Sequence, residues 1–277
     1  MSLKSYISRG LRYIFKGTPV KVVTANISYI SNGRRLAGKK IIITGGGKGL
    51  GAAMARKFVA EGAEVLIAGR NEKKMEELSK TLRCKYLNLD ICDTYSFRPF
   101  IEKADELLGG ADCLINNAGV SFHEATFFDV KPDSFDTQIA TNLKGPYFLT
   151  QEFVKMVNSR KGKGNVIFIS SETGDTMDFR PYGYSKAAIN SMVQGLAYLL
   201  AKDQIRVNAI APGVTVTDMT GVGTDGNLAY EWNLSGRVYL PEEVAETACF
   251  LLSDASACIS GQVVVCNNAN TVNARWK

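Results

Sequence analysis

The stretch KIIITGGGKGLG, from Lys40 to Gly51, decides the fold that the rest of the chain must follow. Its first half, KIIIT, is apolar on both faces and rich in β-branched residues, which is typical of a buried parallel strand. The glycines that follow permit a tight turn and let backbone N–H groups approach a pyrophosphate at the start of a helix. The next residues place four apolar side chains at helical spacing: Leu50, Ala53, Met54 and Phe58. The sequence therefore predicts a strand, a nucleotide-binding loop and a helix.

Short apolar runs alternate with helical patterns along the rest of the chain. The further predicted strands are EVLIAG, CKYLNLD, DCLINNAG, GNVIFISS, IRVNAIAPG and GQVVVC. Helices are predicted in EKKMEELSKTL, around 94–108, within 132–159, around 182–202 and near 241–253. This alternation predicts an α/β fold with a single doubly wound parallel sheet and helices on both faces. We assign residues 39–277 to one Rossmann-type domain, whose ligands should lie at the carboxyl ends of the strands.

The composition limits the kinds of functional site that the protein can contain. His123 is the one histidine among 277 residues, so a histidine-based metal site or a serine–histidine triad is nearly excluded, and no metal is expected. His123 itself is expected to be a loop residue rather than a catalyst. The six cysteines are scattered without a CxxC pair, which indicates reduced thiols of a cytoplasmic protein. No apolar run reaches the roughly 18–20 residues needed to span a bilayer.

Residues 1–38 form a basic extension ahead of this domain. Residues 1–40 contain nine Lys and Arg and no acid, which leaves a mildly acidic body. One helical stripe of the extension would carry Leu3, Tyr6, Ile7, Leu11 and Ile14. Three interpretations stay open: a mitochondrial-type presequence, a membrane-surface helix, or a segment that packs on the body or on a neighbouring subunit. We favour the third over peripheral membrane contact. Nucleic-acid binding is not expected, because no recognised module for it is present.

The end of the second predicted strand bears on the choice of cofactor. Where NAD is bound, an acid about 20 residues after the glycine loop usually holds the ribose 2′-hydroxyl, whereas an arginine suits a 2′-phosphate. The strand here ends IAGRN, with Arg70 and no acid, and Lys48 adds a positive charge within the loop. These residues predict NADP(H) rather than NAD(H).

A candidate proton-transfer pair lies in RPYGYSKAAI, from Arg180 to Ile189. Side chains four residues apart share one face of a helix, and those two apart do not. Tyr182 and Lys186 can therefore reach one site, whereas Tyr184 and Lys186 cannot. The spacing predicts that Tyr182 is the functional tyrosine.

Several motifs, in order and spacing, now match one family. TGGGKGLG resembles its cofactor loop, NLDI presents Asp90 at the adenine position, and NNAG (Asn116–Gly119) resembles the segment that lines the nicotinamide end. TNLKG supplies Asn142, ISSETG resembles the serine strand, YGYSK is the YxxxK signature, and IRVNAIAPG with VTVT resembles the PGxxxT segment. Over roughly residues 38–265 the chain resembles the short-chain dehydrogenase/reductases.

The resemblance implies a set of cofactor-binding residues. These are Gly45, Gly47, Lys48, Gly49, Leu50, Gly51, Arg70, Asp90, Asn117, Ala118, Gly119, Tyr182, Lys186, Pro212, Gly213 and Thr217. It also implies the catalytic residues Asn142, Ser171, Tyr182 and Lys186.

The resemblance assigns a role to each catalytic residue. Tyr182 would exchange a proton with the substrate oxygen, and Lys186 would hold the ribose hydroxyls and lower the tyrosine pKa. Ser171 would hydrogen-bond the developing oxyanion, and Asn142 would order a water in the proton path. The expected activity is NADP(H)-dependent hydride transfer to a carbonyl, or from a secondary alcohol, in a homodimer or homotetramer. A 3-oxoacyl thioester, a sugar or another polar ketone stays open as substrate, and a non-catalytic NADP(H) sensor or a structural subunit is the rival interpretation.

Two features depart from the family's common pattern. Its serine and tyrosine lie about 13 residues apart, whereas Ser171 and Tyr182 are separated by 11. Tyr184 would restore the spacing, but four residues after it stands Ala188 rather than a lysine, so we infer a shortened loop. The choice between Ser170 and Ser171 stays open, with Ser171 preferred because the SxxG pattern follows it. The last strand ends CNNAN in place of the usual Asp-Gly-Gly.

Overall fold

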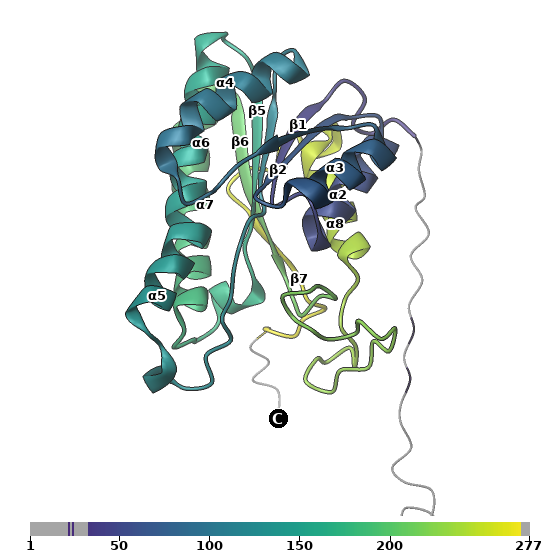
Figure 1. Ribbon diagram of the computed structural model, residues 1–277, viewed down its shortest axis with the longest axis vertical. Coiled ribbons are helices and arrows are strands. Elements are labelled where there is room, and N and C mark those ends of the chain that lie inside the picture. Colours follow the sequence, from purple (N-terminus) through teal and green to yellow (C-terminus); the bar gives the residue numbers. More distant parts are fainter. Residues whose placement is uncertain (1–21, 23, 25–32, 273–277) are drawn as a thin grey trace, which may run out of the picture.

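A computed structural model of the chain describes residues 22, 24 and 33–272 (Figure 1). Its strands are β1 (Lys40–Thr44), β2 (Glu64–Gly69), β3 (Lys85–Asn88), β4 (Cys113–Asn116), β5 (Gly164–Ile169), β6 (Ile205–Pro212) and β7 (Val263–Cys266). They form one seven-stranded sheet in the order β3-β2-β1-β4-β5-β6-β7, and all neighbours are parallel. The predicted fold class is therefore confirmed. Residues 1–21, 23 and 25–32 of the basic extension lie outside the described residues, and the division at residue 38 stays a prediction.

Helices cover both faces of the sheet, as Figure 1 shows. They are α2 (Gly49–Ala60), α3 (Glu72–Leu82), α4 (Phe97–Leu108), α5 (Pro132–Ile139), α6 (Gly145–Ser159), α7 (Pro181–Leu200) and α8 (Pro241–Leu252). Side chains alternate across a strand, so Ile41 and Ile43 of β1 join the core beneath α2, α3 and α8. Ile42 joins the core beneath α4, α6 and α7. Both faces of KIIIT are buried, which is why the stretch is apolar throughout.

The strand order reverses on either side of β1, where β2 and β4 are its neighbours. Ligands of open α/β sheets bind in the crevice that such a reversal leaves at the carboxyl ends of the strands. The glycine loop follows β1, and the NNAG segment follows β4. The topology therefore brings the two motifs together at this crevice.

The helix predicted within 132–159 is interrupted. α5 and α6 are separated by a π-helical turn, Ala140–Lys144, which contains Asn142. The cause lies in the next residues: Pro146 has no N–H to donate to the Asn142 carbonyl one turn earlier. A β-carbon at Gly145 would also clash with the Ile91 carbonyl, so the helix is held close to the segment after β3. π turns of this kind occur frequently at functional sites.

The segment just before β1 belongs to the packed body. Leu36 is fully buried in the core, and its N–H donates to the Glu61 carbonyl. Arg35 pairs with Glu61 and with Glu246, each at 2.8 Å, and so joins α2 to α8.

Candidate active site

The glycine loop presents the start of α2 to the crevice. Gly45 (φ +63°) and Gly49 (φ +52°) adopt the left-handed conformation that other residues rarely take. Lys48, at the N-cap, makes no side-chain cap, and no acidic residue lies in the first turn of α2. The N–H groups of this turn are therefore not capped by an acidic side chain, and together with the helix dipole they suit an anion such as pyrophosphate.

Hydrogen bonds join the glycine loop to the NNAG segment. The Thr44 hydroxyl accepts from the N–H groups of Asn117 (3.0 Å) and Ala118 (3.1 Å). The Asn117 amide donates to the carbonyls of Thr44 (2.8 Å) and Gly45 (3.1 Å). Gly51 packs against the Gly45 carbonyl and the Asn117 amide so closely that a β-carbon there would clash with both. The glycine at position 51 thus permits close contact between the two segments.

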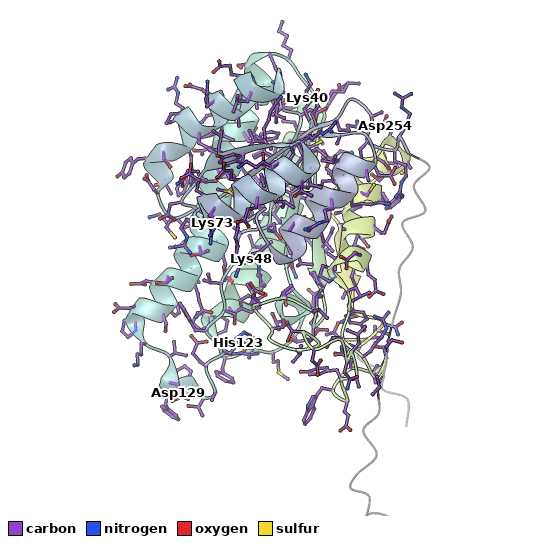
Figure 2. All side chains as sticks on the ribbon, turned by 45° about the vertical axis from the view of Figure 1, so that its right-hand side comes forward. Lys40, Lys48, Lys73, His123, Asp129 and Asp254 are labelled. Atoms are coloured by element: carbon purple, nitrogen blue, oxygen red, sulfur yellow. The ribbon has the colours of Figure 1, made fainter. Side chains whose placement is uncertain are left out.

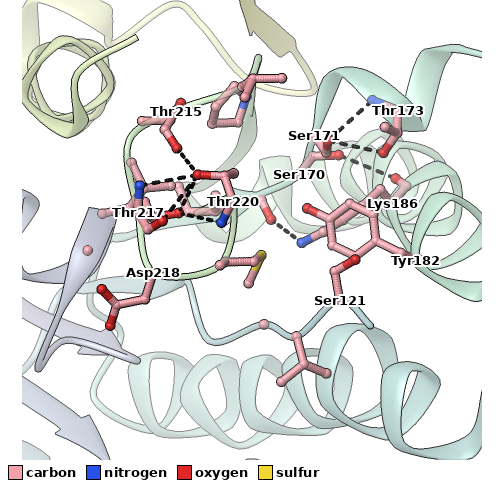
Figure 3. Close-up of a pocket in the computed structure, with 18 of the residues that line it drawn as sticks. Ser121, Ser170, Ser171, Thr173, Tyr182, Lys186, Thr215, Thr217, Asp218 and Thr220 are labelled. Carbon is pink, nitrogen blue, oxygen red and sulfur yellow. Dashed lines mark hydrogen bonds between the residues drawn. The ribbon is translucent and has the colours of Figure 1, made fainter. Parts of the chain in front are cut away.

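A cavity of about 670 Å³ opens at this edge of the sheet, and Figure 3 shows residues that line it. Ser171 lies just beyond β5, and Tyr182 and Lys186 lie in the first two turns of α7. All three line the cavity together with the glycine loop. Tyr184 is 48% exposed and is not among the lining residues. The helical spacing that favoured Tyr182 therefore corresponds to the observed placement.

The two adjacent serines point to different partners. The Ser170 hydroxyl is buried and donates to Asn190 Oδ1 at 2.6 Å. The Ser171 hydroxyl accepts from the N–H (3.2 Å) and hydroxyl (3.0 Å) of Thr173, and it interacts with the Tyr182 side chain. Ser171 is thus the serine that neighbours the tyrosine, and Ser170 anchors α7 to β5.

Lys186 is 5% exposed, and its ammonium donates to the Ile169 carbonyl at 2.8 Å. The same Nζ lies 5.4 Å from the centroid of the Tyr182 ring. Burial lowers the pKa of Lys186 to about 8, because the charged form loses its hydration.

Burial also raises the pKa of Tyr182 above its ordinary value. The interaction with Ser171 and the positive charge of Arg180 oppose this increase. The lowering expected from Lys186 is not among the main causes of this pKa shift. The Lys186 Nζ lies over the Tyr182 ring and donates to the Ile169 carbonyl. Tyr182 keeps its proton at neutral pH, which suits a proton donor.

Asn142 is buried on the π turn, and its side chain binds the chain after NNAG. Its Oδ1 accepts from the Val120 N–H and its Nδ2 donates to the Val120 carbonyl, both at 2.8 Å. Nδ2 also donates to the Ser185 hydroxyl at 3.3 Å. The Asn142 side chain therefore positions the chain after NNAG, and Pro146, one turn later, has no N–H to donate to the Asn142 backbone carbonyl.

The structure brings most of the predicted cofactor residues together. The lining contains Gly45, Lys48, Gly49, Leu50, Asn117, Ala118, Gly119, Tyr182, Lys186, Pro212, Gly213 and Thr217. Four predicted residues are not among the lining residues: Gly47, Gly51, Arg70 and Asp90. Gly47 faces Met75, and Asp90 Oδ1 accepts from the Cys92 N–H at 2.9 Å. Arg70 is exposed directly after β2 and makes no hydrogen bond or ion pair within the described part of the chain.

Lys48 is 62% exposed and pairs with Asp218 at 3.1 Å, which partly offsets the positive charge expected at the loop. Lys48 and His123 are both labelled in Figure 2. His123 has a positive φ of 53° and its Nε2 hydrogen-bonds the Met219 carbonyl at 2.7 Å. This bond joins two loops that line the cavity, so His123 serves as a loop residue in the structure.

Sequence reasoning did not single out three charged residues of the lining: Glu172, Arg180 and Asp218. Arg180 forms a bidentate pair with Asp178, at 2.8 and 2.9 Å. Glu172 follows Ser171 directly. Its position beside the serine strand was the signal in the sequence that could have identified it.

Comparison with known proteins identifies the family. A family model described as enoyl-(acyl carrier protein) reductase matches residues 45–268. The chain is 32% identical to L-fucose dehydrogenase of Bos taurus over 251 residues, which is 86% of this chain and 91% of that protein. It is also 32% identical over 246 residues to the 3-oxoacyl-[acyl-carrier-protein] reductase FabG of Chlamydia pneumoniae, covering 85% of this chain and 98% of the relative.

A solved structure agrees with these relatives. The short-chain type dehydrogenase/reductase from Mycobacterium marinum superposes with a TM-score of 0.79 at 27% identity, over 86% of this chain and 97% of that chain. The fold and the site define a dinucleotide-binding oxidoreductase. The chain belongs to the short-chain dehydrogenase/reductase family.

Proposed function

We propose that the protein is an NADP(H)-dependent oxidoreductase that transfers hydride between the nicotinamide and a carbonyl or secondary alcohol. The observation that carries the proposal is the meeting of Ser171, Tyr182 and Lys186 in one cavity with the glycine loop. A protein that only senses the dinucleotide has no need of a protonated tyrosine beside a serine hydroxyl. A purely structural subunit has no need of the cavity.

The residues present fit a dinucleotide. The turn at the start of α2 offers N–H donors to the pyrophosphate, and Lys186 and Asn117 stand further along the cavity. When bound, the cofactor supplies or accepts the hydride. Arg70 and Lys48 would contact a 2′-phosphate, and the absence of an acid at the end of β2 supports NADP(H) over NAD(H).

Each catalytic side chain then has a role that its surroundings support. Tyr182 donates a proton to the carbonyl oxygen in reduction and takes one back in oxidation. Ser171 hydrogen-bonds the same oxygen as its charge develops. Lys186 places a positive charge beside the Tyr182 ring, and Asn142 fixes the chain after NNAG through Val120. The Asn142 carbonyl is the group that would order a water.

A 3-oxoacyl thioester reductase is the second candidate, because a FabG protein is among the relatives. We further propose a homo-oligomer. Large apolar side chains are exposed on α6 and α7, including Tyr147, Tyr198 (89% exposed) and Leu199, and this supports a subunit contact. The six free cysteines, of which Cys92 and Cys258 are exposed, support a cytoplasmic location. No helix among the described residues is long and apolar enough to cross a membrane.

The test is NADPH oxidation, followed by absorbance, across ketones, aldehydes and acyl thioesters. Tyr182→Phe and the matched variant Tyr184→Phe are assayed beside the native protein. We expect Tyr182→Phe to lose about 10²–10⁴-fold in rate, whereas Tyr184→Phe keeps its activity. Binding of NADPH without any turnover by the native protein would favour the sensor, and loss only in Tyr184→Phe would reject Tyr182 as the proton donor.

A further inference from the structure

Glu172 lines the cavity and directly follows Ser171, the proposed catalytic serine, in the chain. It follows Ser171 in the chain, so the two Cα atoms are separated by one peptide unit, about 3.8 Å. Its charge also acts on Tyr182, whose pKa it raises. Any group held by Glu172 would therefore lie in the same cavity as Ser171 and Tyr182.

The carboxylate is fixed by the chain after β7. Glu172 Oε2 accepts from the side-chain amides of Asn267 at 2.9 Å and Asn270 at 3.4 Å. Asn267 is 2% exposed, and its carbonyl accepts from the Tyr239 hydroxyl at 2.7 Å. Asn270 Oδ1 accepts from the Leu234 N–H at 3.1 Å, within the loop that borders the cavity. The CNNAN segment thus joins Glu172 to the loop 214–239.

Both of these partners are neutral amides. Glu172 forms no ion pair with any described lysine, arginine or histidine, and its Oε1 accepts no hydrogen bond from the described residues. An ionised carboxylate can only accept hydrogen bonds. A fixed carboxylate with a spare oxygen in a substrate cavity is therefore prepared for a ligand that donates one.

We propose that Glu172 is a specificity-determining residue that accepts a hydrogen bond from a substrate hydroxyl next to the reacting carbonyl. The substrate class is then a hydroxylated ketone or aldose, or the corresponding polyol, and not a 3-oxoacyl thioester. An apolar group at this position would exclude water from Oε1 and give it no hydrogen-bond donor, which is costly. A site built around a substrate hydroxyl rejects the analogue that lacks it. This inference rests on the function proposed above.

The experiment compares two ketones of nearly the same shape. Reduction of 2-hydroxycyclohexanone and 2-methylcyclohexanone is measured with NADPH for the native protein and for Glu172→Leu, Glu172→Gln and Asn270→Ala. Asn268→Gly is the control, because Asn268 is exposed, does not hydrogen-bond Glu172, and has a positive φ of 50° that glycine adopts without strain. Acetoacetyl-coenzyme A serves as the thioester, and NADPH binding and thermal unfolding check that each variant is folded.

We expect the native protein to prefer the hydroxyketone by about 10- to 100-fold in kcat/KM, as the loss of one charged hydrogen bond predicts. Glu172→Leu should remove this preference, and Glu172→Gln should retain part of it. Asn270→Ala should reduce the preference, and Asn268→Gly should leave it unchanged. If Glu172→Leu does not fold, the reduced preference of Asn270→Ala carries the test.

Two results would overturn the inference while the proposed function stands. One is turnover of both ketones with the same preference in native protein and in the Glu172 variants. The other is a higher kcat/KM for acetoacetyl-coenzyme A than for the hydroxyketone. A native protein that binds NADPH and reduces no carbonyl compound would overturn the proposed function, and this inference with it.

Discussion

Lys186 lies one helical turn after Tyr182, and its ammonium is held between the Tyr182 ring, 5.4 Å from the centroid, and the Ile169 carbonyl, 2.8 Å away. The arrangement places a charge that is 5% exposed beside the proposed proton donor. Burial favours the neutral amine, so the pKa of Lys186 is lowered to about 8. Keeping Lys186 buried and charged at neutral pH therefore lowers the free energy of unfolding.

Because of this buried charge, the free energy of unfolding depends on pH. Between about pH 8 and the ordinary value of 10.5 the unfolded chain binds more protons than the folded one at Lys186, so the free energy of unfolding rises with pH. The total increase would be on the order of 3 kcal/mol. The Lys186→Met variant has no titrating amine at this position and should not show the increase. Urea unfolding between pH 7.5 and 9.5 should show the native protein gaining stability relative to Lys186→Met.

The exposed Lys202 provides the control for this measurement. Lys202→Met should follow the native protein at every pH. Parallel curves for the native protein and Lys186→Met would mean that the lysine is not buried as the structure shows. The range stops below pH 10 because the raised pKa of Tyr182 begins to lower stability above that value.

Ser171 and Ser170 should differ in their effect on the tyrosine. Reduction requires protonated Tyr182, so its rate falls as the pH rises through the tyrosine pKa. Ser171 lowers that pKa, so in Ser171→Ala the alkaline limb should move to higher pH, and the rate should fall about 10²–10³-fold. Ser170→Ala should leave the limb in place, because its hydroxyl binds Asn190. The measurement is the pH dependence of kcat/KM for both variants. A shift of the alkaline limb in Ser170→Ala alone would mean that Ser170, and not Ser171, acts on Tyr182.

The sequence predicts the fold because local and global signals agree. KIIIT needs burial on both faces and obtains it in the middle of the sheet. The four-residue spacing of Tyr182 and Lys186 is a local property of a helix, so their common site was predictable. The π turn was not predictable in the same way, since apolar periodicity continues through Asn142. Its causes are the missing N–H of Pro146 and contact with Ile91.

The parts of the site that the sequence did not reveal depend on long-range contacts. The bond from Asn267 to Glu172 joins residues 95 apart in the chain. No periodicity or motif reports such a pair. Lys48 illustrates the same point. Its positive charge in the loop was predictable, but its ion-pair partner, Asp218, is 170 residues away in the chain.

The cofactor preference should depend on Arg70 and be opposed by Asp218. Arg70→Ala should raise the Kd for NADPH about 10-fold and leave the Kd for NADH unchanged, since a 2′-phosphate is the only difference between them. Asp218→Asn releases Lys48 from its ion pair and should lower the Kd for NADPH. Fluorescence titration with both nucleotides measures these constants. Arg98→Ala, at an exposed arginine paired with Glu102, is the control, and an equal loss of NADPH and NADH binding in Arg70→Ala would contradict the assignment.

Two glycines test whether the close contact beneath the cofactor loop is required. A β-carbon at Gly51 would clash with the Gly45 carbonyl and lie 2.7 Å from the Asn117 amide, whereas one at Gly195 in α7 would meet nothing within 4 Å. Gly51→Ala should cost about 1–3 kcal/mol of unfolding free energy and abolish NADPH binding, because the loop and the NNAG segment must move apart. Gly195→Ala should instead add about 0.5–1 kcal/mol through its helix propensity. Thermal unfolding and NADPH titration of both variants decide the matter: a Gly51→Ala protein that binds NADPH normally would show that the two segments can separate without loss of the site.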